Sequence, residues 1–235
     1  MNVAIVTGAS RGLGEALATG LAERRWSLVL DGRDAEVLER ALGRVRERSG
    51  APVSAVAGDV SDPEHRAALV AAAGEQGGID LVVNNASTLG VTPLPALADF
   101  SLDELRRTYE VNTLAPLALI QASLPLLRRS PDPRVLNVTS DASVEAYPGW
   151  GGYGSSKAAL DHLSAVLAAE EPGIRTWAVD PGDMRTRMHQ DAFPGEDISD
   201  RPPPATVVPL LLELIEGDRP SGRYRARDLR RADAC

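Results

Sequence analysis

Three side chains between residues 140 and 157 have the types and spacing needed to move a proton at an oxygen atom. Tyr153 and Lys157 stand four residues apart, a spacing that puts both on one face of a helix. Lys157 is the only lysine among 25 basic residues, which indicates a need for a compact ammonium group that arginine does not meet. Ser140 precedes them and could donate to a developing oxyanion. The set suggests acid–base catalysis, although each residue alone has an ordinary structural explanation.

A glycine-rich turn near the start of the chain could bind phosphate. Directly after the apolar run 3–6, Gly8, Gly12 and Gly14 form a G-x-x-x-G-x-G arrangement. Gly8 permits a sharp turn, Gly12 a close approach to a pyrophosphate, and Gly14 tight packing where a helix begins. The free N–H groups of that helix attract an anion. No Gly-Lys-Ser/Thr ending follows, which argues against a P-loop nucleotidase; a turn without any ligand is the plainer alternative.

The residues that choose between two dinucleotides lie about 20 positions further on. The chain there reads Leu30-Asp31-Gly32-Arg33-Asp34. An acidic residue at this place binds a ribose 2′-hydroxyl, whereas an arginine pairs with a 2′-phosphate. Both types are present, so these residues alone leave the choice open.

Short apolar runs alternate with helical patterns along the chain, which is typical of βαβ units. Strands are predicted at 3–6, 27–30, 52–57, 79–83, 134–139, 175–179 and 222–226, and helices at 13–24, 35–48, 63–73, 101–128, 155–169 and 205–215. Ser101 and Glu104 stand in capping-box order, and Pro116 predicts a kink or break. The pattern predicts an α/β fold: a doubly wound, mostly parallel, Rossmann-type sheet of about seven strands with helices on both faces.

We expect residues 1–235 to form one domain, with a Pro-, Gly- and Asp-containing substrate loop at about 183–204. Ligands in such sheets bind beyond the carboxyl ends of the strands, where the glycine turn and Ser140 are predicted to lie.

The order of these motifs resembles the short-chain dehydrogenase/reductase family over nearly the whole chain. The glycine turn, Asn84-Asn85-Ala86, Asn112, Ser140, the Tyr-x-x-x-Lys pair and Pro181-Gly182 with Thr186 carry the resemblance. It implies an NAD(P)-dependent oxidoreductase that transfers a hydride between a nicotinamide and a carbonyl or secondary alcohol. The expected reaction is the reduction of a ketone with NADPH. It also implies a catalytic set of Asn112, Ser140, Tyr153 and Lys157. In the family, tyrosine is the acid/base, lysine binds ribose and lowers the tyrosine pKa, serine orients the carbonyl, and asparagine holds a relay water.

The resemblance also implies the cofactor contacts. They are Gly8, Ser10, Arg11, Gly12, Leu13, Gly14, Arg33, Asp59, Val60, Asn85, Ala86, Tyr153, Lys157, Pro181, Gly182 and Thr186. Asp59 would meet adenine and Thr186 the carboxamide. Arg33 takes the position typical of NADP-preferring members, with Arg11 as a second partner for the 2′-phosphate, so NADP(H) is favoured; NAD(H) is possible because Asp31 and Asp34 are close. Ser87 replaces the family's usual glycine and is expected to change the pocket shape slightly.

Composition narrows the remaining partners. The net charge of −8 repels nucleic acids and anionic lipids. Cys235 is the one cysteine, which excludes an intrachain disulfide. The chain shows no signal-peptide pattern, and its apolar stretch 111–127 reads as too short and too broken to span a bilayer, so a cytoplasmic protein is expected. His65, His162 and His189 lack metal-ligand spacing, so no metal is expected.

Aromatic residues near the catalytic helix could form a substrate pocket. Tyr147 and Trp150 precede Tyr153, and Met188 and Phe193 lie in the predicted substrate loop. The resemblance implies pairing through the helices at about 101–128 and 155–169, giving a homodimer or homotetramer. One alternative is a non-catalytic dinucleotide sensor, which would need no Ser-Tyr-Lys set. The other is an extended-type sugar-nucleotide epimerase or dehydratase, which the short C-terminal part disfavours.

Overall fold

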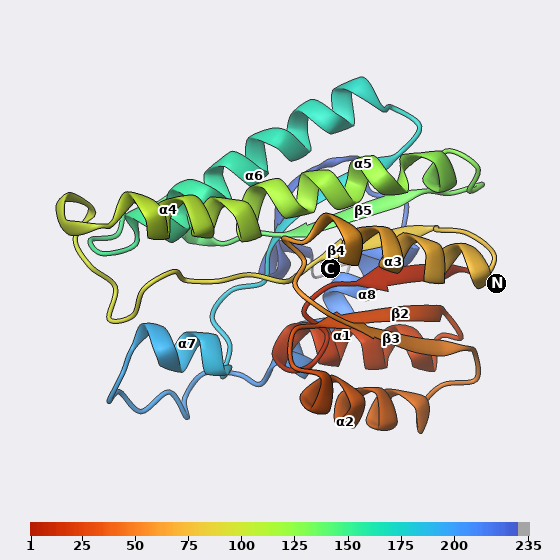
Figure 1. The fold of residues 1–235 in the computed structure, drawn as a ribbon, viewed down its shortest axis with the longest axis horizontal. Helices are drawn as coiled ribbons and strands as arrows, with labels where there is room; N and C mark the ends of the chain where they lie inside the picture. Colours follow the sequence, from red (N-terminus) through yellow and green to blue (C-terminus); the bar gives the residue numbers. More distant parts are fainter. Residues whose placement is uncertain (230–235) are drawn as a thin grey trace, which may run out of the picture.

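Seven parallel strands form one sheet within residues 1–229, the part of the chain that this computed structural model describes (Figure 1). The strands lie in the order β3-β2-β1-β4-β5-β6-β7. Their bounds are β1 Val3–Val6, β2 Ser27–Gly32, β3 Val53–Ala57, β4 Leu81–Asn84, β5 Arg134–Val138, β6 Arg175–Asp180 and β7 Gly222–Arg225. The strand order reverses between β1 and β4, where doubly wound sheets bind ligands. The predicted fold class is confirmed. Cys235, the one cysteine of the sequence, lies outside the described residues.

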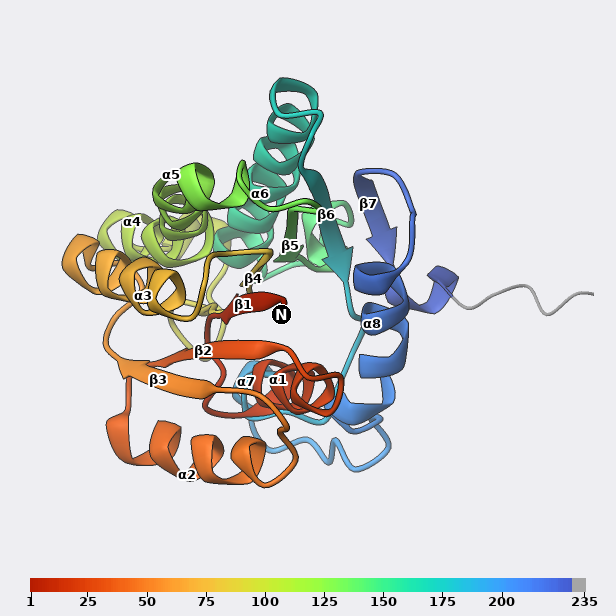
Figure 2. The same ribbon diagram turned by 90° about the vertical axis from the view of Figure 1, so that its right-hand side faces the viewer.

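Helices cover both faces of the sheet, as Figure 2 shows from the end where the N-terminus lies. Their bounds are α1 Gly12–Glu23, α2 Ala35–Arg46, α3 Pro63–Glu75, α4 Leu102–Tyr109, α5 Ala115–Leu127, α6 Gly151–Glu170, α7 Arg187–Ala192 and α8 Val208–Glu216. Helices α1, α2 and α8 pack on one face, and α3, α5 and α6 lie on the other. Successive strand residues serve opposite faces: Ala4 and Val6 pack with α1, and Val3 and Ile5 with α3 and α5.

Local sequence explains where several helices begin. Asp34 caps α2 by accepting from the Val37 N–H at 3.1 Å, and Asp62 caps α3, whose first residue is proline. The predicted capping box before α4 is wrong. Ser101 makes no side-chain cap, and the Glu104 carboxylate pairs with Arg107 instead. Because Ser101 takes no part, α4 begins without this stabilisation.

The long helix after β4 is interrupted where Pro116 predicted a break. A π-helical turn, Glu110–Leu114, separates α4 from α5, and Pro116 lies in the first turn of α5, where a missing N–H matters little. This turn places Asn112 toward the interior, where its side chain is fully buried.

The combined helical run Leu102–Leu127 is long and apolar enough to cross a membrane by length and composition alone. The expectation that this region is too short therefore does not hold for helix length, because the charged helix α4 continues through the π-helical turn into the apolar helix α5. Leu119, Ile120 and Leu127 are buried against the sheet, as in the core helix of a globular protein.

Candidate active site

The glycine turn has the shape of a phosphate cradle. Gly8 and Gly12 adopt positive φ angles of 63° and 62°, which other residues rarely tolerate. A Cβ on Gly14 would meet the Gly8 carbonyl oxygen at 2.3 Å, so the turn must pack directly on the start of α1. Arg11, at the N-cap of α1, makes no side-chain cap, which leaves the helix N–H groups open to an anion. Leu13 is buried below the turn, and Ser10 contacts Gly32.

Asn85 supports this turn with its side chain. The Asn85 amide donates to the carbonyls of Thr7 and Gly8 at 2.9 and 3.1 Å. The backbone N–H groups of Asn85 and Ala86 both donate to Thr7 Oγ1. The amide of Asn85 is thus engaged by the protein, and any contact of this segment with a cofactor falls to other atoms.

Both acidic residues that made the cofactor choice ambiguous serve the protein itself. The Asp31 carboxylate accepts from the Gly8 N–H at 3.0 Å and pairs with His65 Nε2 at 2.6 Å, and both side chains are buried. Asp34 caps α2. No sequence pattern predicts that Asp31 and His65 meet, because His65 lies on α3, 34 residues later.

Arg33 stands free beside this buried pair. Among residues 1–229, the guanidinium groups of Arg33 and Arg11 have no hydrogen bond or ion pair, so both can receive an anionic group. Asp59 follows β3, and its carboxylate accepts hydrogen bonds from Ser61. Partial burial by itself would raise the pKa of Asp59. The bonds from Ser61 and the charge of Arg33 outweigh it and hold the pKa below its usual value. Val60 beside it is buried.

Tyr153 and Lys157 lie in the first turns of α6, which starts at Gly151 and not at 155 as predicted. Both are buried, with 8% and 1% of their surfaces exposed. The Lys157 ammonium donates to the Val138 carbonyl oxygen at 2.8 Å and lies 5.7 Å from the centre of the Tyr153 ring. Burial lowers the pKa of Lys157 to about 8. Its other N–H groups remain to bind hydroxyls.

The chain by itself raises the pKa of Tyr153. Burial is the main cause, the carboxylates of Asp180 and Asp141 add to it, and the hydroxyls of Ser140 and Ser87 oppose it. The Lys157 ammonium donates to the Val138 carbonyl oxygen, and the lowering of the Tyr153 pKa by Lys157 that the resemblance implies stays a prediction. A phenolate here therefore depends on groups that hydrogen-bond to its oxygen.

Ser140 follows β5 and lies beside Tyr153. Its hydroxyl donates to Asp141 Oδ1 at 3.0 Å and accepts from the Ala142 N–H at 3.2 Å. Tyr147 donates to the other oxygen of Asp141 at 3.0 Å. This arrangement fixes the Ser140 oxygen close to the phenol that it is predicted to assist.

The side-chain amide of Asn112 is fully engaged by neighbouring groups of the protein. Its Oδ1 accepts from Ser87 Oγ at 3.0 Å and from Thr88 N at 2.8 Å. Its Nδ2 donates to the Thr88 carbonyl at 2.8 Å and to Ser156 Oγ at 2.9 Å. These four bonds use the whole hydrogen-bonding capacity of the side-chain amide, and the relay role of Asn112 stays a prediction. The amide joins α4–α5, α6 and the segment after β4.

The segment after β6 closes over the glycine turn. Gly182, at φ 77°, follows Pro181 and donates to Asp180 Oδ1. Thr186 caps α7, and a Cβ on Gly12 would lie 3.6 Å from its methyl group. The carboxamide role of Thr186 stays a prediction, but its place beside the turn matches it.

Trp150 and Phe193 form an aromatic wall beside Tyr153. Trp150 meets the Tyr153 ring edge-on at 5.7 Å between centroids, and Phe193 lies 5.9 Å from Trp150. Met188 and Leu94 pack on the same cluster. The predicted loop thus brings Met188 and Phe193 to the catalytic tyrosine.

Arg223 on β7 also reaches the site, which sequence reasoning missed. Its guanidinium donates to the Ser140 carbonyl at 2.9 Å, to Ser143 Oγ at 3.1 Å and to Asp161 at 2.8 Å. Asp161 is one turn after Lys157 on α6. No spacing signal links a residue on an edge strand to one 83 positions earlier.

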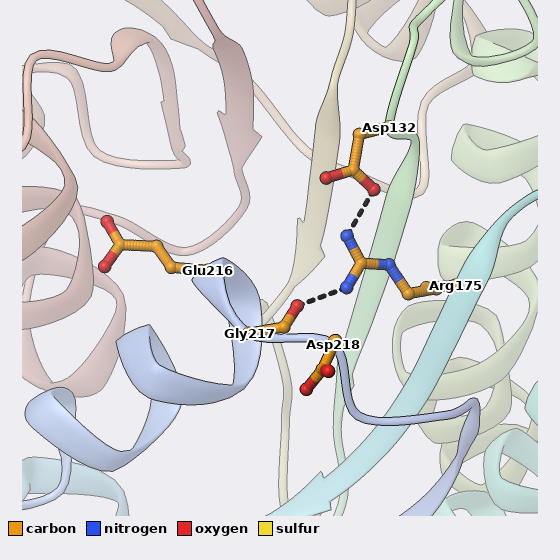
Figure 3. Close-up of a pocket in the computed structure, with 5 residues that line it drawn as sticks. All are labelled: Asp132, Arg175, Glu216, Gly217 and Asp218. Carbon is orange, nitrogen blue, oxygen red and sulfur yellow. Dashed lines mark hydrogen bonds and ion pairs between the residues drawn. The ribbon is translucent and has the colours of Figure 1, made fainter.

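A second feature lies at the opposite end of the strands, where β5 and β6 begin. A cavity of about 590 Å³ there is lined by Asp132, Arg175, Glu216, Gly217 and Asp218 (Figure 3). The Arg175 guanidinium is bound to Asp132 and to the Gly217 carbonyl. In residues 1–229 no group of three or more His, Cys, Asp or Glu could hold a metal ion.

A nicotinamide dinucleotide fits the residues present. The cradle of Gly8, Gly12 and Gly14 suits a pyrophosphate, and Arg33 suits a phosphate at the adenosine end. The buried ammonium of Lys157, with hydrogen-bonding capacity to spare, suits the hydroxyls of a ribose.

Comparison with known proteins agrees with this geometry. The family model of the short chain dehydrogenases matches residues 2–197. The chain belongs to this family. It is therefore an oxidoreductase, and its relatives indicate a nicotinamide cofactor.

Similar proteins cover nearly the full length of this short-chain dehydrogenase. It is 34% identical over 238 residues to sepiapterin reductase from Xenopus laevis, covering 91% of this chain and 90% of that protein. A short chain dehydrogenase from Shigella flexneri complexed with NADP has a TM-score of 0.89 at 29% identity, covering 96% of this chain and 97% of that one. An alcohol dehydrogenase from Thermococcus sibiricus complexed with 5-hydroxy-NADP has a TM-score of 0.86 at 30% identity, covering 96% and 95%.

Proposed function

We propose that this enzyme is an NADPH-dependent ketone reductase, which transfers a hydride between NADP(H) and a carbonyl or secondary-alcohol substrate. The observation that carries the proposal is the meeting of Ser140, Tyr153 and Lys157 beside the glycine turn. A non-catalytic sensor would have no use for this set.

The bound nicotinamide would supply the hydride, and the side chains of the chain would handle the proton. Ser140 would donate to the carbonyl oxygen of the substrate and hold it near Tyr153. Tyr153 would give its proton to that oxygen in reduction and take it back in alcohol oxidation. Lys157 would bind the ribose hydroxyls and so place the reacting ring beside Tyr153.

The preference for NADP(H) is supported by the charges around β2. Asp31 is buried with Gly8 and His65, and Asp34 caps α2, so neither carboxylate is directed by the protein to a ribose. Arg33 is free to pair with a 2′-phosphate, with Arg11 as the second partner. Three similar structures contain NADP, NADPH or 5-hydroxy-NADP.

The aromatic wall supports an apolar group beside the carbonyl of the substrate. Trp150 and Phe193 present ring surface next to Tyr153, and such surfaces bind apolar ligands. We also propose that the enzyme is cytoplasmic and that it forms a homodimer or homotetramer.

A substrate panel tests the proposal. Purified protein is mixed with NADPH or NADH and with ketones, quinones or hydroxysteroids, and the loss of reduced-nicotinamide absorbance is followed. We expect turnover of at least one ketone, with kcat/KM at least about tenfold higher for NADPH. Binding of NADPH without turnover of any compound would favour the sensor.

A further inference from the structure

Ser87 stands where the family resemblance expects glycine, and the structure gives its hydroxyl two neighbours. Ser87 Oγ donates to Asn112 Oδ1 at 3.0 Å. The Tyr153 hydroxyl lies within hydrogen-bonding reach of the same Ser87 oxygen and of Ser140. Ser87 therefore links the catalytic phenol to the π-helical turn that carries Asn112.

The backbone around Ser87 is held on both sides. The two N–H groups before it donate to Thr7 Oγ1 at 2.9 and 3.0 Å. Thr88, after it, is bonded to Asn112 through both its N–H and its C=O, each at 2.8 Å. Because the segment is fixed and the Ser87 oxygen already lies near both groups, only the hydroxyl hydrogen has to rotate about the Cβ–Oγ bond to change partner.

The two hydroxyls near Tyr153 differ in what they would give up by turning to a phenolate. Ser140 donates to the Asp141 carboxylate, and in the proposed function its hydroxyl turns to the oxygen of the substrate, so it is engaged in either case. Ser87 donates to the neutral amide oxygen of Asn112, which keeps its bond from the Thr88 N–H. Ser87 is the more readily available donor.

We propose that Ser87 is a further catalytic residue: its hydroxyl turns from Asn112 to the Tyr153 oxygen as the phenol releases its proton to the solvent, and it stabilises the phenolate. The phenolate then accepts the hydroxyl proton of an alcohol substrate while the hydride leaves the carbon for an oxidised nicotinamide dinucleotide. In the reverse direction the phenol returns the proton to the carbonyl oxygen. The inference rests on the proposed function, because that reaction changes the protonation state of Tyr153.

The charged groups around Tyr153 come from several elements and stay unchanged in the test. Burial raises the pKa of the phenol, and Asp180 after β6 and Asp141 after β5 raise it further. Lys157 lies on α6, and His189 of α7 packs on the aromatic wall. Variation of the Ser87 hydroxyl alone isolates its effect from these charges.

The experiment compares Ser87→Ala and Ser87→Gly with Ser87→Thr, which keeps a hydroxyl. The pH dependence of kcat for alcohol oxidation gives the midpoint at which Tyr153 loses its proton. We expect Ala and Gly to move this midpoint upward by about one pH unit and Thr to stay near the original value. Below the midpoint the rate falls up to about tenfold, and at higher pH the deficit shrinks. Ser54→Ala, on β3 and bonded to Gln76, is the matched control.

A second readout needs no turnover. The phenolate absorbance of each protein, taken as the difference from its Tyr153→Phe counterpart with NADP⁺ present, gives the same midpoint directly. An upward shift for Ala and Gly supports the inference even where no substrate has been found. An unchanged midpoint, with kcat lowered equally at every pH, would mean that Ser87 only holds the structure together and would overturn it. Failure of every substrate to turn over counts against the proposed function alone.

Discussion

At the scale of single residues, the proposed proton transfer depends on Tyr153. Tyr153→Phe keeps the ring that packs on Trp150 but removes the proton. We expect kcat to fall by roughly 10²–10⁴-fold while NADPH still binds. Steady-state kinetics and a binding titration check this, with Tyr224→Phe on β7 as the control. Near-normal kcat in the Tyr153 variant would contradict the assignment.

Lys157 links the active site to stability. Its pKa of about 8 in the folded chain lies below the ordinary lysine value of 10.5, because burial disfavours the charged form. Between these values the unfolded chain holds more protons than the folded one, so stability rises with pH. The full gain is on the order of 3 kcal/mol across that window and is absent below pH 8.

Urea unfolding of the protein without cofactor at pH 7 and pH 9.5 measures this gain. Lys157→Met has a similar length and no charge, so its stability should lack this rise. Equal pH dependence in the two proteins would show that the buried ammonium carries no such penalty.

In the proposed function, Arg33 sets the preference for NADPH. Arg33→Ala should weaken NADPH binding by about 1.5–3 kcal/mol and leave NADH nearly unchanged, because only NADPH carries the 2′-phosphate. Titration of both cofactors checks this. Arg40→Ala on the exposed face of α2, where Arg40 pairs with Glu36, controls for a general loss of positive charge. Tighter binding of NADH than NADPH by the unchanged protein would refute the preference.

At the scale of elements, the Asp31–His65 pair joins α3, β2 and the glycine turn. His65→Ala would leave the buried Asp31 carboxylate with one fewer partner. We expect a loss of stability on the order of 3 kcal/mol and weaker binding of NADPH and NADH alike, because the Gly8 N–H depends on Asp31. Thermal unfolding and cofactor titration measure both effects. The double variant Asp31→Ala/His65→Ala should recover part of the stability; a single variant as stable as the original would show that the pair is dispensable.

Repeating patterns made most helices and strands predictable. Contacts between side chains distant in sequence could not be predicted in this way. The alternation of apolar runs placed all seven strands within a few residues, and Pro116 marked the break before α5. Ser140, Tyr153 and Lys157 were found because their types and spacing carry chemistry. Their surroundings were not, since the contacts of Asp31 with His65 and of Arg223 with Ser140 join side chains distant in sequence. Ser87 was noticed only as a departure from glycine; its bond to Asn112 depends on the π-helical turn.

At the scale of the whole molecule, helices α5 and α6 have apolar surface that the sheet does not cover. Leu114 before α5 and Val166 on α6 are 48% and 38% exposed. A small hollow between the helices is lined by Leu117, Ile120, Asn137, Leu160, Leu163, Ser164 and Leu167. We expect two copies to pair across this face about a two-fold axis, burying more than about 1,000 Å².

Light scattering decides the assembly state. We expect a mass of at least twice the 24.9 kDa of one chain at micromolar concentration. Val166→Glu would place a charge in the contact and should shift the mass toward one chain. The unchanged protein running as a single chain would rule the dimer out.

The placement of the three tryptophans gives the enzyme an internal optical probe. Trp26 and Trp177 are buried beneath arginines, at 5.7 and 5.6 Å from Arg134 and Arg175, far from the catalytic end of the sheet. Of the three tryptophans, Trp150 is the one that packs against the rings of Tyr153 and Phe193. We therefore expect emission from Trp150 to report occupancy of the proposed substrate pocket, and emission from the other two indoles to report the integrity of the core. Subtracting the spectrum of Trp150→Phe separates ligand entry from unfolding in one fluorescence trace, without any attached dye.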